Sequence, residues 1–343
     1  MPANPIRVVL NFLSFFVLSV LSFTLGNERP QPLVVEGRTM GTTYRILYFD
    51  EPEHRDFKND IDSLLTTVNR AINTFDPASE ISRFNQSEKG IRPELPYLYD
   101  ILKTGKKIYK ASGGAFDPTV MPLVNAWGFG PEKSGQPSIS KIDSLKNLIG
   151  FNNIRFSKKR IKKSEEGIQL DMGGIGQGFG ADMIFQFLRS KGIDHMLVEL
   201  GGEGMAWGRN LQKEKPWTIG ILNPNSTPDN QYFQAYVTLH NQAFTTSGNY
   251  FNYKIVDGRK FGHTINPATG YPIQHSLLSA SVFADDCTTA DGWATAFMVM
   301  GVEKAMATVK SLRGVEALFI FSNQTGELET YATPGIAKQI TLE

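Results

Sequence analysis

Cysteine is nearly absent from this sequence, and neither sign of charge is in excess. The single cysteine, Cys287, excludes an internal disulfide and any metal site built from several thiolates. Oxygen ligands and hard cations are therefore the expected metal chemistry. The 35 basic and 34 acidic residues give a formal net charge of +1, so the basic excess typical of nucleic-acid-binding proteins is missing. We expect no nucleic-acid partner.

The first 26 residues carry little charge and differ from the rest of the chain. Arg7 is their only charged side chain, and an apolar run from Val8 to about Leu25 follows it. This pattern predicts an export signal, and the run is also about long enough to span a bilayer as an uncleaved anchor. No cysteine stands near its end, so we expect no lipoprotein. The segment predicts an exported, periplasmic protein, either free or tethered to the inner membrane by residues 1–26, with residues 27–33 as a linker.

Residues 34–343 show no internal repeat and no clear domain boundary, and we treat them as one domain. Apolar residues at helical spacing predict helices over 59–72, 98–109, 177–191, 290–300 and 303–312. Runs rich in β-branched and aromatic residues predict strands over 34–49, with a turn at 39–43, and over 196–200, 217–222, 233–239, 278–284 and 317–321. Because helices and strands come partly in blocks, the pattern favours an α+β fold over a doubly wound parallel sheet.

Glycines are concentrated in the segment Asp171-Met-Gly-Gly-Ile-Gly-Gln-Gly178, ahead of the predicted helix over 177–191. Backbone N–H groups at such a helix start can approach a phosphate, and the helix dipole favours an anion there. The spacing matches neither a P-loop nor a trustworthy dinucleotide fingerprint. A tight strand-to-helix turn that needs glycine for its dihedral angles explains the same residues.

Asp291 and Thr295 stand four residues apart in the segment that begins at Asp285. On a helix their oxygens would share one face, and a carboxylate with a hydroxyl is suitable chemistry for Mg²⁺. The alternative is an ordinary helix N-terminus, capped by Asp286 or Thr288, with carboxylates on the surface.

His263 opens the segment His-Thr-Ile-Asn-Pro-Ala-Thr-Gly270 and is one of five histidines. Histidine can take a proton near neutral pH, which is what a hydroxyl nucleophile needs from a base. A structural hydrogen bond beside the Pro/Gly turn is the alternative.

Two turns place an aromatic residue before Asp-Pro, at Phe75 and at Phe116. An aromatic ring could stack on a flavin or adenine, and the adjacent Asp could accept a hydrogen bond from a ring N–H or a ribose hydroxyl. Ordinary turn and capping chemistry explains these residues equally well.

Together, these segments and their order closely resemble the ApbE family of FAD:protein FMN transferases. The resemblance covers about Val35 to Val315. The matching segments are Arg38-Thr-Met-Gly-Thr, Phe75-Asp-Pro-x-Ser-Glu-Ile-Ser-x-Phe-Asn, Gly114-Ala-Phe-Asp-Pro-Thr, Asp171-Met-Gly-Gly-Ile-Gly-Gln-Gly, Leu200-Gly-Gly, Thr246-Ser-Gly-Asn-Tyr, His263-Thr-Ile-Asn-Pro-x-Thr-Gly and Thr289-Ala-Asp-Gly-x-Ala-Thr.

The resemblance implies two interlocked lobes of mixed or antiparallel sheet packed with helices, related to the T-fold. It also implies an exported enzyme that binds FAD and Mg²⁺, joins FMN to a threonine or serine hydroxyl of a target protein through a phosphoester bond, and releases AMP. The implied acceptors are exported FMN-binding proteins or subunits of membrane redox complexes that carry a motif like Asp-Gly-x-Thr-Gly-Ala-Thr.

Carried over by position, the resemblance assigns roles to individual residues. Asp291 and Thr295 look like the side-chain ligands of magnesium, with the Gly174 carbonyl as a third ligand, and His263 looks like the base that activates the acceptor hydroxyl. The positions that resemble FAD contacts are Met40, Phe75, Ala115, Phe116, Asp117, Asp171, Gln177 and Ile265. The family often has lysine where Gln177 stands, so this chain offers a neutral amide there in place of a charge.

Two other functions fit the same residues. A magnesium-dependent FAD pyrophosphatase would use water as the acceptor and yield free FMN and AMP. An exported flavin-binding protein without chemistry would bind FAD and release no AMP.

Overall fold

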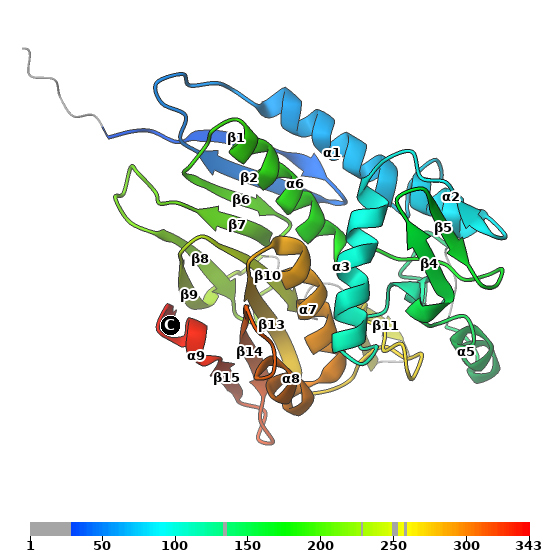
Figure 1. Cartoon of the computed structure of the whole chain (residues 1–343). Coiled ribbons are helices and arrows are strands. Elements are labelled where there is room, and N and C mark those ends of the chain that lie inside the picture. Colours follow the sequence, from blue (N-terminus) through cyan, green and yellow to red (C-terminus); the bar gives the residue numbers. More distant parts are fainter. Residues whose placement is uncertain (1–28, 133–135, 228, 249–252, 257–258) are drawn as a thin grey trace, which may run out of the picture.

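A central eight-stranded sheet organises the chain (Figure 1). In this computed structural model the described residues are 29–132, 136–227, 229–248, 253–256 and 259–343, so the predicted targeting segment over 1–26 lies outside them. All neighbouring strands pair antiparallel. In spatial order the strands are β1 (Leu33–Thr39), β2 (Thr42–Tyr48), β6 (Met196–Leu200), β7 (Glu203–Trp207), β10 (Gln242–Gly248), β13 (Leu277–Ala284), β14 (Val315–Ser322) and β15 (Leu328–Ala332).

The predicted break in the first strand is a tight hairpin between β1 and β2. Thr39 pairs with Thr42, which leaves Met40 and Gly41 as a two-residue loop with φ of 49° and 75°. Positive φ at both positions is the type I′ geometry that matches the twist of antiparallel strands. A non-glycine residue in the left-handed region is strained, and such strain is common at functional sites.

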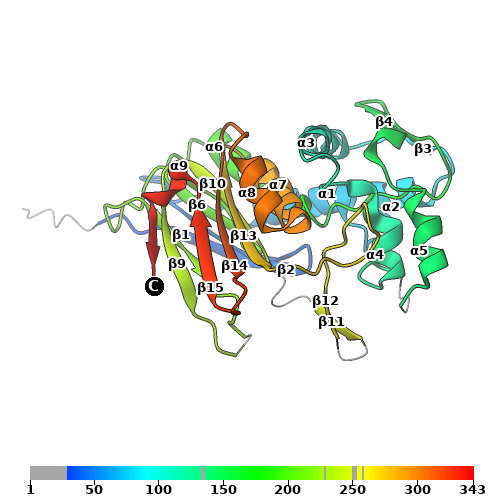
Figure 2. The ribbon, with the colours of Figure 1, turned by 90° about the horizontal axis from the view of Figure 1, so that it is seen from below.

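Helices cover one face of the central sheet (Figure 2). They are α1 (Lys58–Ile72), α6 (Gly176–Ser190), α7 (Cys287–Met300) and α8 (Val302–Val309). Helix α7 packs against α3, α6, β10 and β13, and most of its residues are buried on every side. A helix that is apolar all round belongs in a protein core, so any ionisable group on α7 requires a specific explanation.

A smaller sheet and a short helix cover the opposite face. The strands β8 (Trp217–Leu222), β9 (Phe233–Leu239) and β16 (Ile340–Leu342) form this sheet in the order β16-β9-β8, and α9 (Pro334–Ala337) lies beside it. Buried apolar side chains of β8 and β9 form one cluster with those of the central sheet. The antiparallel sheets and their helices therefore form the α+β architecture predicted from the sequence.

A second lobe lies beyond α7, at the right of Figure 1. It contains α2 (Glu80–Gln86), α3 (Tyr97–Ala111), the short 3₁₀ helix over Pro118–Val120, α4 (Met121–Ala126), α5 (Ile139–Lys146), a second 3₁₀ turn over Phe151–Asn153, and a small sheet of β3 (Gly90–Ile91), β5 (Arg160–Lys163) and β4 (Ile154–Ser157). The hairpin of β11 (Tyr253–Val256) and β12 (Arg259–Gly262) leads to the loop after His263. The indole N–H of Trp127 donates to the carbonyl of Gly270 at 2.9 Å, which ties the second lobe to that loop.

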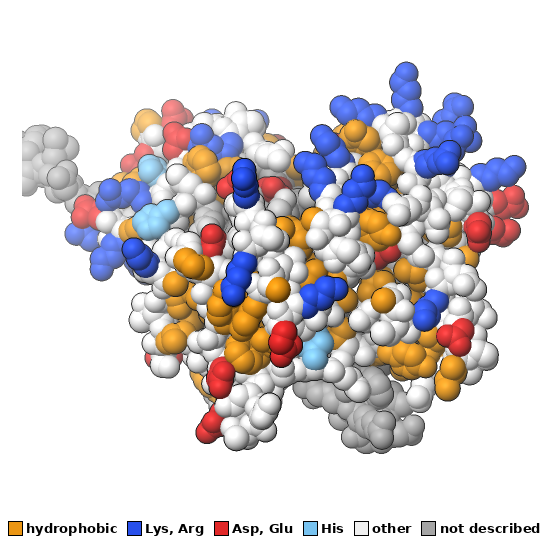
Figure 3. All heavy atoms as spheres, turned by 60° about the horizontal axis from the view of Figure 1, so that its bottom comes forward, with side chains coloured by type: hydrophobic (Ala, Val, Ile, Leu, Met, Phe, Trp, Pro, Cys, Tyr) orange, Lys and Arg blue, Asp and Glu red, His pale blue; other side chains and the backbone are white. Residues whose placement is uncertain are grey.

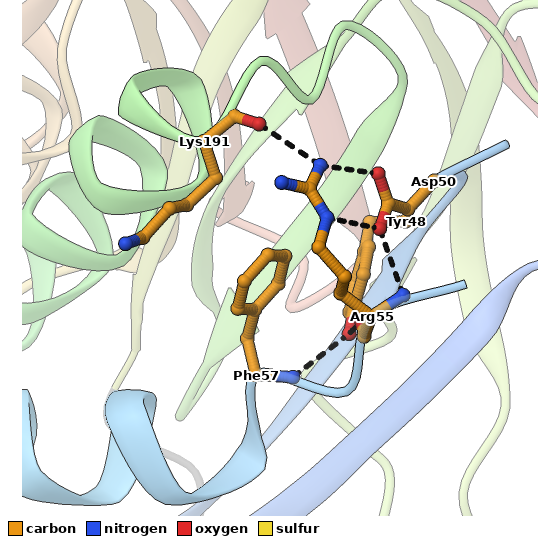
Figure 4. Close-up of polar contacts among 5 residues, drawn as sticks. All are labelled: Tyr48, Asp50, Arg55, Phe57 and Lys191. Carbon is orange, nitrogen blue, oxygen red and sulfur yellow. Dashed lines mark hydrogen bonds and ion pairs between the residues drawn. The ribbon is translucent and has the colours of Figure 1, made fainter. Parts of the chain in front are cut away.

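An ion pair fixes the connection between β2 and α1 (Figure 4). The carboxylate of Asp50 is buried and accepts hydrogen bonds from the Arg55 side chain at 2.6 and 2.8 Å and from the Arg55 backbone N–H at 2.8 Å. The same guanidinium donates to the carbonyl of Lys191, just past α6, at 3.1 Å. The contact holds the start of α1 against the end of α6.

Charge is unevenly distributed despite the small net value. Figure 3 shows Lys and Arg side chains gathered on the lobe that carries the small sheet of β3 to β5. The exposed basic residues of this lobe include Arg155, Lys158, Lys159, Arg160 and Lys162. None of them lines the cavity described below.

Most of the predicted elements are confirmed. Helices α1, α3 and α6 begin and end within about two residues of the predicted bounds, and β6, β8 and β9 match the predicted ranges. Helix α7 begins at Cys287, earlier than predicted, because Asp286 caps it by accepting from the backbone N–H of Thr289 at 2.7 Å. Three strands of the central sheet, β7, β10 and β15, were missed. Among the described residues no helix is both long and apolar enough to cross a bilayer.

Candidate active site

The glycine-rich segment crosses directly beneath α7 where α6 begins. A Cβ on Gly174 would lie 2.7 Å from Oγ1 of Thr295, and a Cβ on Gly178 would lie 2.7 Å from Cβ of Asp291. Glycines 173, 174, 176 and 178 do not adopt positive φ, so dihedral freedom does not explain them. Their missing side chains let two helices touch, and this close approach brings Asp291 and Thr295 onto the turn.

Three oxygens meet at this contact. The hydroxyl of Thr295 lies 3.2 Å from the carbonyl oxygen of Gly174, and Oδ2 of Asp291 accepts from the backbone N–H of Gly178 at 2.9 Å. The predicted magnesium ligands, which are 121 and 117 residues apart in the chain, are therefore neighbours in space. Asp286 caps the same helix, so the capping interpretation of this segment and a site at Asp291 are both compatible with the structure.

Asp291 is an acid in an apolar setting. Its residue is 4% exposed, and burial raises the pKa of its carboxyl to about 7. The hydrogen bond from Gly178 opposes this rise, whereas the negative charge of Asp182 adds to it. A buried carboxylate without a cationic partner is costly, and no Lys or Arg forms an ion pair with Asp291 in the described part of the chain.

Every candidate residue from the sequence lies around one cavity of about 690 Å³, between the central sheet and the second lobe. This volume falls within the range of small-molecule sites. The candidates that line it are Met40, Phe75, Ala115, Phe116, Asp117, Asp171, Gly174, Gln177, His263, Ile265, Asp291 and Thr295.

His263 and Asp171 share one wall of the cavity. His263 is half-buried at the end of the β12 segment. Burial raises the pKa of the Asp171 carboxyl, and the N–H of Gly173 and the nearby charge of His263 partly offset that rise. The charge of His263 therefore favours the ionised form of Asp171.

The two aromatic turns differ in what they offer to a ligand. Phe75 is 66% exposed at the cavity, so its ring is available for stacking. Phe116 is 3% exposed and packs in the hydrophobic core. Both oxygens of Asp117 already accept hydrogen bonds, one from Thr119 and one from the backbone N–H of Phe151, because this side chain caps a 3₁₀ turn. In this conformation the Phe116 ring is therefore packed in the core, and the Asp117 carboxylate is partly occupied by the turn that it caps.

Gln177, Met40 and Ile265 complete the wall. The amide nitrogen of Gln177 lies 3.0 Å from the position that a Cβ of Gly201 would take, so this side chain rests on the β6–β7 turn. The Met40 side chain lies against Gly180 of α6. Ile265 is buried with Leu123 in a small cluster of the second lobe.

Sequence reasoning missed two buried acids near the site. Asp182 accepts from the backbone N–H groups of Cys287 and Thr288, each at 2.8 Å, and from the Thr288 hydroxyl, so it anchors the start of α7 to α6. Burial raises its pKa to about 6. Glu203 is 5% exposed and lines the cavity. Two features of the sequence could have pointed to these acids. Asp182 is a charged residue next to the apolar stripe of the predicted helix over 177–191, and Glu203 directly follows Leu200-Gly-Gly.

Acidic, histidine and cysteine side chains alone do not make a metal site here. Among the described residues no three His, Cys, Asp or Glu side chains gather closely enough to hold a metal by themselves. A site with one carboxylate, one hydroxyl and one backbone carbonyl falls outside that pattern.

Comparison with known proteins gives consistent results. The model of the ApbE family matches residues 40–319. The FAD:protein FMN transferase of Vibrio cholerae is 36% identical over 302 residues, covering 86% of this chain and 89% of that protein. The enzyme of the same name from Escherichia coli is 32% identical over 343 residues, covering 95% and 96%. The solved flavin transferase ApbE from Vibrio cholerae superposes with a TM-score of 0.82 at 32% identity, covering 90% of this chain and 99% of that structure.

Proposed function

Since the chain belongs to the ApbE family and is a flavin transferase, we propose that it moves FMN from FAD onto a threonine or serine hydroxyl of another protein through a phosphoester bond, with release of AMP. One observation carries the proposal. The Gly174 carbonyl, the Asp291 carboxylate and the Thr295 hydroxyl meet on the wall of a cavity whose volume suits a dinucleotide.

These oxygens suit Mg²⁺. Carboxylate, hydroxyl and carbonyl groups are all hard donors, and the 3.2 Å between the Thr295 and Gly174 oxygens lets both face one small cation. A cation would also offset the cost of burying Asp291. When bound there, Mg²⁺ would neutralise charge that develops on the phosphates during transfer.

His263 is the proposed general base. It accepts the proton of the acceptor hydroxyl while that oxygen forms a bond to the flavin-side phosphorus. The bond from this phosphorus to the bridging oxygen breaks, and AMP departs with that oxygen. The position of His263 in the cavity wall beside Asp171 supports this role, because a base must lie within reach of the proton that it abstracts.

The other candidates would hold FAD in place. Phe75 offers an open ring face to the flavin or the adenine. Asp171, Gln177 and Met40 would contact the dinucleotide from the glycine-rich turn and the β1–β2 hairpin, and Ala115, Phe116, Asp117 and Ile265 would shape the wall, mainly through backbone and apolar atoms.

The proposed acceptors are exported proteins with a motif like Asp-Gly-x-Thr-Gly-Ala-Thr, and the proposed location is the periplasm, free or tethered through residues 1–26. Fractionation of cells that express the full chain tests the location. Recovery of the mature protein in the cytosol would contradict it.

The test of the activity is mass spectrometry of a peptide with this motif after incubation with the protein, FAD and Mg²⁺. The proposal predicts covalent addition of one FMN to the peptide and an equal amount of AMP. AMP with free FMN and an unmodified peptide would indicate a pyrophosphatase. Tight FAD binding without AMP would indicate a flavin-binding protein.

A further inference from the structure

Glu203 is the acid at the cavity that the proposed site does not use. It opens β7 directly after the Gly201-Gly202 turn. Its residue is 5% exposed, and its Oε2 atom is buried without a hydrogen-bond partner among the described residues. It lines the same cavity as Asp291 and Gly174.

A buried carboxylate oxygen without a partner destabilises the folded protein, since burial removes its water and nothing replaces the lost hydrogen bonds. No Lys or Arg of the described chain forms an ion pair with Glu203. Gln177, which lies at the turn before Glu203, provides an amide and no charge. A partner for Oε2 of Glu203 must therefore come from a group bound in the cavity.

Asp291 indicates what kind of group satisfies it. Asp291, the other buried acid of this cavity, lies on α7 and is 4% exposed. Strand β7 packs against both α6 and α7, so two buried acids face the cavity from different elements. A neutral hydrogen-bond donor would serve Glu203 but leave the repulsion between the two acids. A divalent cation relieves both the desolvation and the repulsion.

We propose that Glu203 is a second carboxylate of the divalent-cation site, acting from the sheet while Asp291 acts from α7. This inference rests on the proposed function, because it adds a residue to the same cation site. Mg²⁺ keeps several of its own waters and binds through few protein carboxylates, so an acid that contacts the cation or its waters is expected to strengthen binding substantially.

The experiment measures binding of Mn²⁺ alone, by electron paramagnetic resonance of the free ion, to the full chain without FAD or acceptor. The variants are Glu203→Gln, Glu203→Asp and the control Glu199→Gln. Glu199 lies on β6, is half-buried, and accepts from the backbone N–H of Gly202 at 2.7 Å, but does not line the cavity. It therefore controls for loss of a nearby negative charge.

The expected result is a loss of roughly 10- to 100-fold in Mn²⁺ affinity for Glu203→Gln, the usual effect of removing a supporting residue at a metal site. Glu203→Asp should keep more affinity than Glu203→Gln, and Glu199→Gln should change it by less than about threefold, as expected for a screened charge. Thermal melting of each metal-free variant establishes that it is folded.

Equal Mn²⁺ affinity in wild type and Glu203→Gln overturns the inference and leaves the proposed function standing. An equal loss of Mn²⁺ affinity in Glu203→Gln and Glu199→Gln also overturns the inference, because it would mean a general effect of removing negative charge. Unchanged Mn²⁺ affinity with weakened FAD binding in EDTA would make Glu203 a dinucleotide contact. Absence of Mn²⁺ binding in the wild type overturns this inference together with the metal part of the proposed function.

Discussion

Asp182 supports the site from outside the cavity, and its replacement by asparagine has a predictable dependence on pH. The carboxylate accepts hydrogen bonds from Cys287, Thr288 and the Thr288 hydroxyl at the start of α7. Asparagine has one acceptor oxygen, so at least one donor of α7 loses its partner. A buried donor left without a partner costs about 1 to 3 kcal/mol, and Asp182→Asn should therefore destabilise the protein.

The size of that effect should fall as pH rises. Burial raises the folded-state pKa of Asp182 from 3.8 to about 6. A carboxyl with a raised folded pKa contributes stability that is present below its unfolded pKa and is lost as pH rises through its folded pKa. Between pH 5 and pH 7.5 the loss amounts to roughly 1.4 kcal/mol, since one pKa unit corresponds to about 1.36 kcal/mol. Asparagine does not titrate, so the wild-type advantage over the variant should shrink by this amount.

Urea unfolding of both proteins at pH 5 and pH 7.5 measures the difference directly. Unfolding free energies come from linear extrapolation, and equal slopes in the two proteins show that the variant unfolds a structure of the same size. An advantage that is constant over this pH range, or one that grows with pH, would refute the account of Asp182 as a buried acid with a raised pKa.

Other substitutions test other parts of the account. Asp291→Ala should abolish Mg²⁺-dependent flavinylation while circular dichroism shows an intact fold, because the residue serves the site more than the core. His263→Ala should slow transfer roughly 10²- to 10⁴-fold, the usual effect of losing a general base, in single-turnover assays. Gly178→Ala should cost about 1 to 3 kcal/mol in thermal or urea unfolding, because its methyl group would lie 2.7 Å from Cβ of Asp291. Arg55→Ala should destabilise the protein at neutral pH, because it removes the side-chain donors of the buried Asp50. Hydrogen bonding to Arg55 holds the pKa of Asp50 below its ordinary 3.8, so the part of this loss that depends on ionised Asp50 is present above about pH 4 and is lost as pH falls through the folded-state value.

Each of these expectations has a contrary result. Wild-type flavinylation by Asp291→Ala would remove the metal assignment, and an unchanged transfer rate in His263→Ala would return that residue to a structural role. Unaltered stability of Gly178→Ala would mean that the two helices can separate at no cost. An Arg55→Ala penalty as large at pH 2 as at neutral pH would show that the lost contacts are not those of an ionised Asp50.

Local patterns predicted the regular elements well because those patterns reflect local physics. Helices α1, α3 and α6 carry clean apolar stripes, and the Met40-Gly41 turn follows from hairpin geometry. Strands β7 and β10 were missed because both contain small or polar residues in place of a β-branched run. Their strand conformation comes from pairing with neighbours inside the sheet, which no short window of sequence contains.

The residues of the site could be named in advance, but not their spatial relations. The glycine turn is explained by the approach of α7 within van der Waals distance, a contact across more than 100 residues of chain. Phe116 had the same sequence context as Phe75, yet its ring is buried in the core while that of Phe75 is exposed. Glu203 belongs to a strand that was not predicted, so its burial beside Asp291 could not be anticipated.

A crystal structure of the protein with FAD and Mn²⁺ tests the central claim most directly, because Mn²⁺ is located by its anomalous scattering. The account predicts an anomalous peak in contact with oxygens of Asp291, Thr295 and Gly174, with the FAD phosphates beside it in the cavity. A cation bound elsewhere, or FAD bound outside this cavity, would contradict it.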